Sequence, residues 1–308
     1  MLAAMTVERV PYDEFSMFHE NAEEFGIPYG GPPSVRREFV EVDPGRRLSA
    51  LVWGEDAPEV VLLHGGAQNA HTWDTVALAL GRPLVAVDLP GHGHSDGGRD
   101  GWVAPQTNAE DVATVVRALA PRARAVVGMS LGGMSALALA HQAPELVPSL
   151  VLVDITPGVT AGKASAITAF IDGPASFDSF DDLLARTIAF NPTRSESSLR
   201  RGILHNALQR EDGTWVWRYA RHRAARPEGI EHPDLGSLWD AVSAYTGPLM
   251  LVRGMRDQSV VDDADEAELL RRRPDARVEH VQDAGHSVQG DTPVELARLI
   301  ADFTAEGP

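Results

Sequence analysis

The chain contains no cysteine among its 308 residues. Disulfide bonds, thiolate-bound metals and a cysteine nucleophile are therefore excluded. Lysine is almost absent as well, because Lys163 is the only one in the sequence. Positive charge is scarce overall, with 27 lysine and arginine residues against 44 aspartates and glutamates and a formal net charge of −17. A chain this acidic disfavours non-specific binding to nucleic acid or to anionic membranes.

Long apolar runs are also missing. No run approaches the ~20 residues that a membrane-spanning helix needs. Residues 1–15 lack the basic stretch followed by an apolar stretch that marks a secretory signal peptide. These two absences lead us to expect a cytoplasmic protein without a membrane span.

Short apolar runs alternate with amphipathic segments through most of the chain. The apolar runs have the composition of strands buried on both faces of a parallel sheet, and the segments between them show helical spacing. The runs are residues 60–64, 83–89, 123–129, 149–155, 247–254 and 276–281, and the helical segments are 72–80, 109–119, 131–141, 264–272 and 293–303. Residues 35–42 and 46–54 alternate apolar and polar side chains, which predicts an antiparallel hairpin. The pattern predicts an α/β fold with a doubly wound, mostly parallel sheet.

The alternation breaks once, between residues 157 and 247, where several helix-like pieces occur without a clear strand. An insertion of this length is uncommon as a plain loop, so we expect a helical cap at 157–247. The α/β core then consists of residues 35–156 and 248–308. Residues 1–34 are acidic and end in a stretch rich in glycine and proline, and we expect an N-terminal extension there.

Residues 128–132 read Gly-Met-Ser-Leu-Gly and stand where an apolar strand gives way to a helix. This G-x-S-x-G spacing is typical of a nucleophile elbow, a sharp turn whose glycines allow strained backbone angles at the serine. A plain turn serine has the same five-residue pattern. The context of strand, turn and helix favours Ser130 as a nucleophile.

A serine hydroxyl needs a base to accept its proton, and the sequence offers 11 histidines. His286 follows the last predicted strand and precedes the final predicted helix, so it emerges at the same sheet edge as Ser130. Most of the other histidines lie in a glycine-rich loop at 91–98, near a helix end or in the expected cap. His286 is therefore the expected general base, with a surface-loop histidine as the alternative.

The imidazole in turn needs a carboxylate to hold its tautomer. Asp257 and Asp154 each follow a predicted strand, and both satisfy the chain order serine, aspartate, histidine. We favour Asp257, because its strand directly precedes the one that leads to His286. Asp154 is then a structural hydrogen-bonding residue, with the role of the acid as its alternative.

Acyl transfer also needs hydrogen-bond donors for the developing oxyanion. The sequence His64-Gly65-Gly66 follows a predicted strand and forms a flexible loop, which His64 holds in place. The N–H groups of Gly66 and Leu131 are the expected donors, with Ala67 as the alternative to Gly66. An ordinary Gly-Gly loop is the competing interpretation.

Several motifs occur together in order. They are HGG at 64–66, DLPGHGHSDG at 88–97, GMSLGG at 128–133, and the pair GMRD and AGH at 254–257 and 284–286. Over residues 35–305 the chain resembles the α/β-hydrolase superfamily, in its capped, serine esterase-like branch. The resemblance implies an eight-stranded sheet with a cap after the sixth strand, and it implies the roles given above to Ser130, Asp257 and His286. Dehalogenases and epoxide hydrolases of this fold carry aspartate at the elbow, so Ser130 argues against them.

These residues predict hydrolysis of a carboxylic ester or lactone through an acyl-enzyme, a route that needs no metal or cofactor. Some aromatic residues of the expected cap form its own core, and the remainder face the cleft and favour a small-molecule substrate with an apolar part. These aromatic residues are Phe170, Phe177, Phe180, Phe190, Trp215, Trp217 and Trp239. The arginine-rich residues 218–229 are either a solvated helix face or an attractor of anionic substrates.

Two other functions stay open at this point. One is hydrolysis of a carbon–carbon bond in a diketone-like substrate, although Met129 and Ala67 depart from the motifs of that branch. The other is ligand binding without catalysis on the same fold. The substrate's identity and the oligomeric state do not follow from the sequence.

Overall fold

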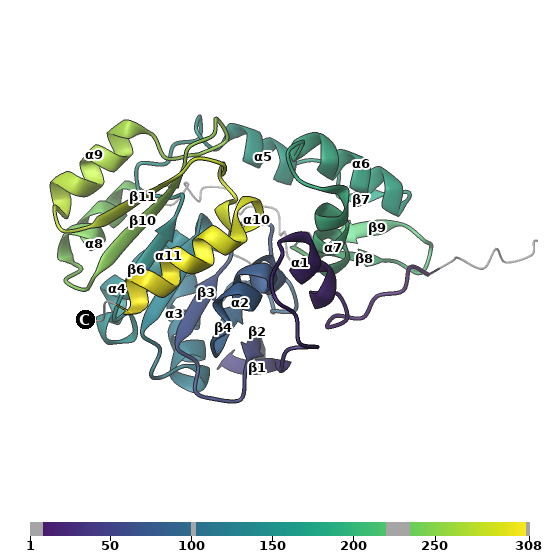
Figure 1. Cartoon of the computed structure of the whole chain (residues 1–308), viewed down its shortest axis with the longest axis horizontal. Helices are drawn as coiled ribbons and strands as arrows, with labels where there is room; N and C mark the ends of the chain where they lie inside the picture. Colours follow the sequence, from purple (N-terminus) through teal and green to yellow (C-terminus); the bar gives the residue numbers. More distant parts are fainter. Residues whose placement is uncertain (1–8, 100–102, 220–234, 306–308) are drawn as a thin grey trace, which may run out of the picture.

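The computed structural model describes residues 9–99, 103–219 and 235–305 and centres on an eight-stranded sheet (Figure 1). The strand order is β1-β2-β4-β3-β5-β6-β10-β11. The bounds are β1 (Val35–Asp43), β2 (Arg46–Trp53), β3 (Val60–Leu63), β4 (Leu84–Val87), β5 (Ala125–Met129), β6 (Leu150–Val153), β10 (Leu249–Gly254) and β11 (Arg277–Val281). Strand β2 runs antiparallel to both of its neighbours, and the other pairs are parallel. The predicted α/β fold and its mostly parallel sheet are confirmed.

Helices bury both faces of the sheet, which explains why its central strands are continuously apolar. Successive strand residues point to opposite faces, so Val126 and Val127 of β5 belong to two different core clusters. Helices α3, α4 and α8 pack on one face, and α2 and α11 pack on the other (Figure 1). Their bounds are α2 (Asp74–Leu80), α3 (Pro105–Leu119), α4 (Leu131–Gln142), α8 (Leu238–Ala244) and α11 (Pro293–Ala305), and α9 (Asp263–Arg272) lies between β10 and β11 in the chain.

The segment between β6 and β10 differs from the expected purely helical cap. It contains α5 (Ser165–Ile171), α6 (Phe180–Phe190) and α7 (Glu196–Asn206). It also contains a small antiparallel sheet of β7 (Ser176–Phe177), β8 (Ala207–Gln209) and β9 (Trp215–Trp217), in the order β7-β9-β8. Strands of two or three residues are too short to show a periodic pattern, so they could not be predicted from the sequence. Helix α8 packs against α4, and Trp239 therefore belongs to the core layer.

The N-terminal segment was expected to be an extension, but its described residues pack against both the core and α7. Helix α1 (Phe18–Glu24) packs beside α2, and Phe18 is only 2% exposed, with its ring 5.0 Å from that of Trp53. On its other side, the guanidinium of Arg201 in α7 binds Asn21 and Glu24. Residues 9–25 therefore lie between the core and α7, and they help to build the cavity described below (Figure 1).

Short helices complete the described part of the chain. They are η1 (Ala70–Trp73), η3 (Pro144–Leu146), η5 (Leu235–Ser237) and α10 (Val288–Asp291). Among the described residues, no helix combines the length and the apolar character needed to cross a membrane. Residues 220–229, which make up most of the arginine-rich stretch, lie outside the described residues.

Candidate active site

Ser130 stands at the turn between β5 and α4 with backbone angles of φ +51° and ψ −120°. Residues with a Cβ rarely adopt a positive φ, so this turn stores strain of about 1–3 kcal/mol. Glycines on both sides make it possible. A Cβ on Gly128 would collide with the carbonyl oxygen of Gly132, and a Cβ on Gly132 would collide with that of Leu63. The turn places Ser130 in the wall of a cavity beyond the carboxyl ends of the strands.

His286 lines the same cavity, and a buried carboxylate holds its ring. Nδ1 of His286 lies 2.9 Å from Oδ2 of Asp154, whose side chain is fully buried. Asp154 also accepts hydrogen bonds from the N–H of Gly254 at 2.9 Å, the hydroxyl of Ser259 at 2.6 Å and the N–H of Val260 at 3.1 Å. The contact with this carboxylate places the ring proton of His286 on Nδ1. Nε2 is then the nitrogen free to act as a base.

The prediction that Asp257 partners His286 is wrong, because Asp154 occupies that position. Asp257 is exposed at the rim of the cavity, and no hydrogen bond or ion pair joins it to another described residue. Strands β6 and β10 are neighbours in the sheet, so both aspartates emerge at the same edge. The loop after β10 separates them: Ser259 and Val260 bind Asp154, so the loop closes over that carboxylate and leaves Asp257 outside.

The candidate oxyanion donors lie in the loop after β3 and at the start of α4. The N–H of Ala67 is already engaged, since it donates to Nε2 of His92 at 3.0 Å. The N–H groups of Gly66 and Leu131 make no hydrogen bond with any residue that the structure describes, and both residues line the cavity. This arrangement favours Gly66 over Ala67 as the first oxyanion donor.

The side chains of His64 and Asn206 hold this loop in place. Nδ1 of His64 lies 2.7 Å from the carbonyl oxygen of Gly65, and its Nε2 accepts the N–H of Leu89 at 2.9 Å. Burial lowers the pKa of His64 to about 3, so the ring stays neutral and keeps both bonds at ordinary pH. Ala67 has φ +60°, and its carbonyl oxygen accepts a hydrogen bond from Asn206 at the end of α7. Sequence reasoning identified the anchoring role of His64 but missed Asn206, because nothing local relates it to a loop 139 residues away.

The cavity has a volume of about 710 Å³ and an apolar wall contributed by the segment between β6 and β10. Aromatic and aliphatic residues of that wall are Ile167, Phe170, Ile171, Phe190, Trp217 and Tyr219. The rings of Phe170 and Phe190 stack with their centres 4.3 Å apart. Phe177, Phe180 and Trp215 pack within the small sheet and its helices instead. The wall offers apolar surface to a substrate within reach of Ser130.

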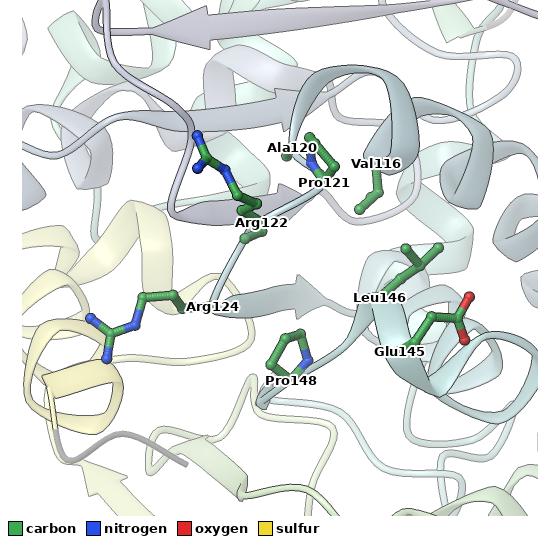
Figure 2. A pocket seen from close by; sticks show the side chains of 9 residues that line it. Val116, Ala120, Pro121, Arg122, Arg124, Glu145, Leu146 and Pro148 are labelled. Carbon is green, nitrogen blue, oxygen red and sulfur yellow. The ribbon is translucent and has the colours of Figure 1, made fainter.

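A second, smaller hollow of about 300 Å³ lies at the opposite edge of the sheet (Figure 2). Arg122 and Arg124 line it from the residues before β5, and Pro148 lines it from those before β6. Because these residues precede their strands, the hollow is at the amino ends of the strands. It is therefore remote from Ser130 and His286.

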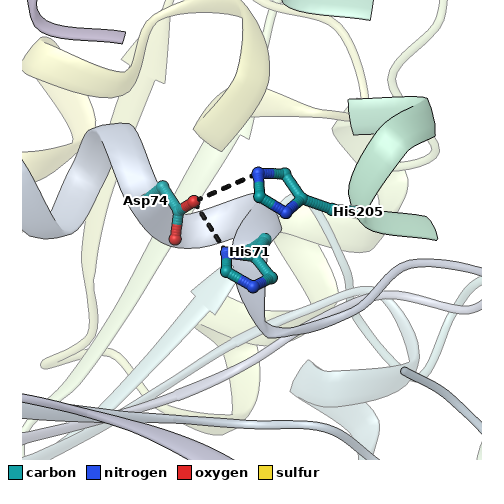
Figure 3. A group of neighbouring side chains, drawn as sticks. All are labelled: His71, Asp74 and His205. Carbon is teal, nitrogen blue, oxygen red and sulfur yellow. Dashed lines mark hydrogen bonds and ion pairs between the residues drawn. The ribbon is translucent and has the colours of Figure 1, made fainter. Parts of the chain in front are cut away.

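A buried polar cluster borders the main cavity (Figure 3). Oδ2 of Asp74 lies 2.8 Å from Nδ1 of His71 and 3.8 Å from Nε2 of His205. The second nitrogen of each ring is also occupied. Oε1 of Glu14 lies 3.0 Å from Nε2 of His71, and the hydroxyl of Tyr12 lies 2.9 Å from Nδ1 of His205. Neither histidine was singled out from the sequence, since the five residues come from three distant segments.

The two histidines of this cluster carry different charge. Burial by itself lowers the pKa of His71, but the carboxylates of Asp74 and Glu14 outweigh it and raise that pKa to about 9. Burial and the neighbouring His71 hold the pKa of His205 well below its ordinary value. His71 is thus an imidazolium at neutral pH, and the ring stacked on it 3.8 Å away is neutral.

Comparison with known proteins agrees with this geometry. Residues 60–299 match the model of the alpha/beta hydrolase family. The chain is 48% identical over 302 residues to the esterase Rv0045c of Mycobacterium tuberculosis, covering 94% of this chain and 96% of the relative. A solved structure of that esterase, from work on its inhibition by transition metals, has a TM-score of 0.84 at 45% identity and covers 96% of this chain and 100% of its own.

A more distant relative is the 3-hydroxybutyrate-oligomer hydrolase of Cupriavidus necator, which is 28% identical over 88% of this chain and 98% of its own length. The relatives support an enzyme of the esterase type. The family match over most of the chain and the mostly parallel eight-stranded sheet lead to one conclusion: the chain belongs to the alpha/beta hydrolase family.

Proposed function

We propose that the protein hydrolyses a carboxylic ester through an acyl-enzyme, with Ser130 as nucleophile, His286 as general base and Asp154 as the acid that orients it. The observation that carries the proposal is the buried contact of 2.9 Å between His286 and Asp154, in a cavity that Ser130 also lines from a strained turn. Nucleophile, base and orienting carboxylate are the three parts that serine acyl transfer requires.

The reaction proceeds in two halves. Oγ of Ser130 attacks the ester carbonyl carbon while Nε2 of His286 takes the hydroxyl proton. The N–H groups of Gly66 and Leu131 stabilise the oxyanion, and the alcohol leaves with the proton from His286. Water then attacks the acyl-enzyme with His286 again as base, which releases the carboxylic acid and restores Ser130.

The segment between β6 and β10 acts as a cap that selects the substrate. Phe170, Phe190 and Trp217 support binding of an acyl or alcohol group with an apolar part. The M. tuberculosis relative is named as an esterase and the C. necator relative as an oligomer hydrolase, so we assign an ester rather than a carbon–carbon bond. A lactone, which is an internal ester, suits the same chemistry.

A fluorophosphonate probe and a series of p-nitrophenyl esters test this function. The probe is expected to label the wild type and not Ser130→Ala, and hydrolysis is expected to vary with acyl chain length. Folded wild-type protein that takes no label would overturn the proposal in favour of ligand binding without catalysis. Turnover of a ring-cleavage diketone without turnover of any ester or lactone would replace it by carbon–carbon hydrolysis.

A further inference from the structure

We propose that Asp74, His71 and His205 form a site for one divalent transition-metal ion, such as Zn²⁺ or Co²⁺, in the wall of the cavity and separate from Ser130 and His286. Each of the three residues offers one ligand atom, and these atoms all lie within 4.8 Å of one another. All three side chains are buried. Two imidazoles and one carboxylate are a donor set that zinc and cobalt prefer.

To hold an ion, the contact between Asp74 and His71 must widen and the contact between Asp74 and His205 must shorten. Ligand atoms around tetrahedral zinc lie roughly 3.3 Å apart when each bond is about 2.0–2.1 Å. Oδ2 of Asp74 and Nδ1 of His71 are 2.8 Å apart, and Nε2 of His205 is 3.8 Å from the same oxygen. The two rings are stacked 3.8 Å apart at an angle of 12°, so the ring of His205 must tilt away from that of His71 before both nitrogens can face one ion (Figure 3).

In each ring, the nitrogen that points away from Asp74 has a polar partner, as is usual for histidines that bind a metal ion. In metal sites, the nitrogen that does not bind the ion usually contacts a carboxylate or another polar group, which fixes the tautomer and the ring orientation. Here Nε2 of His71 faces Glu14 at 3.0 Å, and Nδ1 of His205 faces the hydroxyl of Tyr12 at 2.9 Å. Nδ1 of His71 and Nε2 of His205 are thereby the nitrogens directed toward Asp74.

One oxygen of the Asp74 carboxylate is also without a hydrogen-bond partner in the described part of the chain. Its Oδ1 is buried and has no hydrogen-bond partner among the described residues. An unsatisfied buried acceptor is destabilising, and a cation at this carboxylate would relieve that cost. Because Asp74, His71 and His205 all line the cavity, an ion can enter from it and keep a water molecule as a further ligand.

The local charge favours a divalent ion as well. Asp74, Glu14 and Asp88 provide three carboxylates within one connected network, and Arg37 binds Glu14 and Asp88. When the ion binds, the proton that His71 shares with Asp74 is released to water and both imidazoles are neutral.

Titration of the metal-free protein with Co²⁺ tests the site by visible absorption, without any use of hydrolysis. We expect one Co²⁺ ion per wild-type chain, and an affinity at least tenfold lower in His205→Gln. His141→Gln is the matched control, because His141 is an exposed histidine on α4, and it should bind like the wild type. No saturable Co²⁺ binding by the wild type, or unchanged affinity in a folded His205→Gln protein, would overturn the proposal.

A second measurement uses the wild type alone, so it does not depend on how a variant folds. Anomalous diffraction at the cobalt edge from Co²⁺-soaked crystals should give a peak between Asp74, His71 and His205. A peak found only at His286 or at surface histidines would refute the site. Ser130→Ala is expected to bind Co²⁺ normally, which keeps this result distinct from the fate of the proposed hydrolysis.

Discussion

The side-chain amide of Asn206 donates a hydrogen bond of 2.6 Å to the carbonyl oxygen of Ala67. Asn206 ends α7 in the segment inserted between two sheet strands, whereas Ala67 adjoins the expected oxyanion donor Gly66. On the other side of the same residue, His92 accepts the N–H of Ala67. The inserted segment therefore restrains the conformation of the loop that carries the proposed oxyanion donor Gly66.

Replacing Asn206 should slow the chemical step more than it weakens substrate binding. We expect Asn206→Ala to lower kcat about 10- to 100-fold, because small displacements of a catalytic group have effects of that order, with a smaller change in KM. Steady-state kinetics on a p-nitrophenyl ester measure both constants. Gln142→Ala is the control, since the amide of Gln142 binds the carbonyl oxygen of Gln106 and neither residue lines the cavity. An equal loss of kcat in both variants would contradict a specific effect on the loop.

Replacing each of the two candidate acids by asparagine in turn should separate their roles. Asp154→Asn is expected to lower kcat about 10³- to 10⁴-fold, because the amide no longer holds the correct tautomer of His286. Asp257→Asn should stay within a few fold of the wild type, since Asp257 is exposed and contacts no part of the triad. Melting temperatures establish that both variants are folded before their rates are compared. A larger loss in Asp257→Asn would restore the assignment made from the sequence.

Replacing Gly132 by alanine tests how tightly the turn at Ser130 is packed. We expect Gly132→Ala to lower the free energy of unfolding by about 1–3 kcal/mol, because the added methyl group meets the backbone of Leu63 and His64 in the adjoining strand and loop. Gly30→Ala is the control, since a Cβ there meets no atom within 4 Å. Urea denaturation followed by tryptophan fluorescence compares the two. Equal stability of the two variants would mean that the turn tolerates a side chain.

His64 should make the free energy of unfolding depend on pH. Its pKa is about 3 in the folded protein, against an ordinary value of 6.5 for a solvated histidine, so the unfolded chain binds the proton more tightly. The contribution of neutral His64 to the free energy of unfolding is fully present above pH 6.5 and is lost as pH falls toward 3. In that range the free energy of unfolding changes by about 1.4 kcal/mol per pH unit. Urea denaturation at several pH values should therefore give a shallower slope for His64→Asn than for the wild type. Parallel curves for the two proteins would exclude His64 as the titrating group.

The parts of the fold that repeat a strong local pattern were predictable from the sequence. Val126 and Val127 lie on opposite faces of β5 and are both buried, so their strand is continuously apolar and stands out. The turn at Ser130 was also predictable, because glycine is required on both of its sides and the requirement is local. The location of His286 at the same edge of the sheet was predictable as well, because His286 follows a strand and precedes a helix.

Features that depend on distant partners were not predictable in the same way. Asp154 and Asp257 have the same local context, and only the closure of a loop onto Asp154 distinguishes them. The hydrogen bond between Asn206 and Ala67 and the stacking of His71 on His205 join segments that no periodic pattern relates. Nothing in residues 9–25 alone indicates that they pack against α7.

The docking of this N-terminal segment sets an order of events during synthesis. Asn21 binds Arg201, Tyr12 contacts His205 and Val10 binds Gln209, so the paired residues are 180 to 199 positions apart. A ribosome that adds about 5–20 residues per second needs roughly 10–40 seconds to make the later partner. Residues 9–25 therefore cannot make these contacts until α7 and β8 have been synthesised. The part of the cavity wall that they supply is therefore completed after α7 and β8 have been made and before β10, β11 and His286 are added.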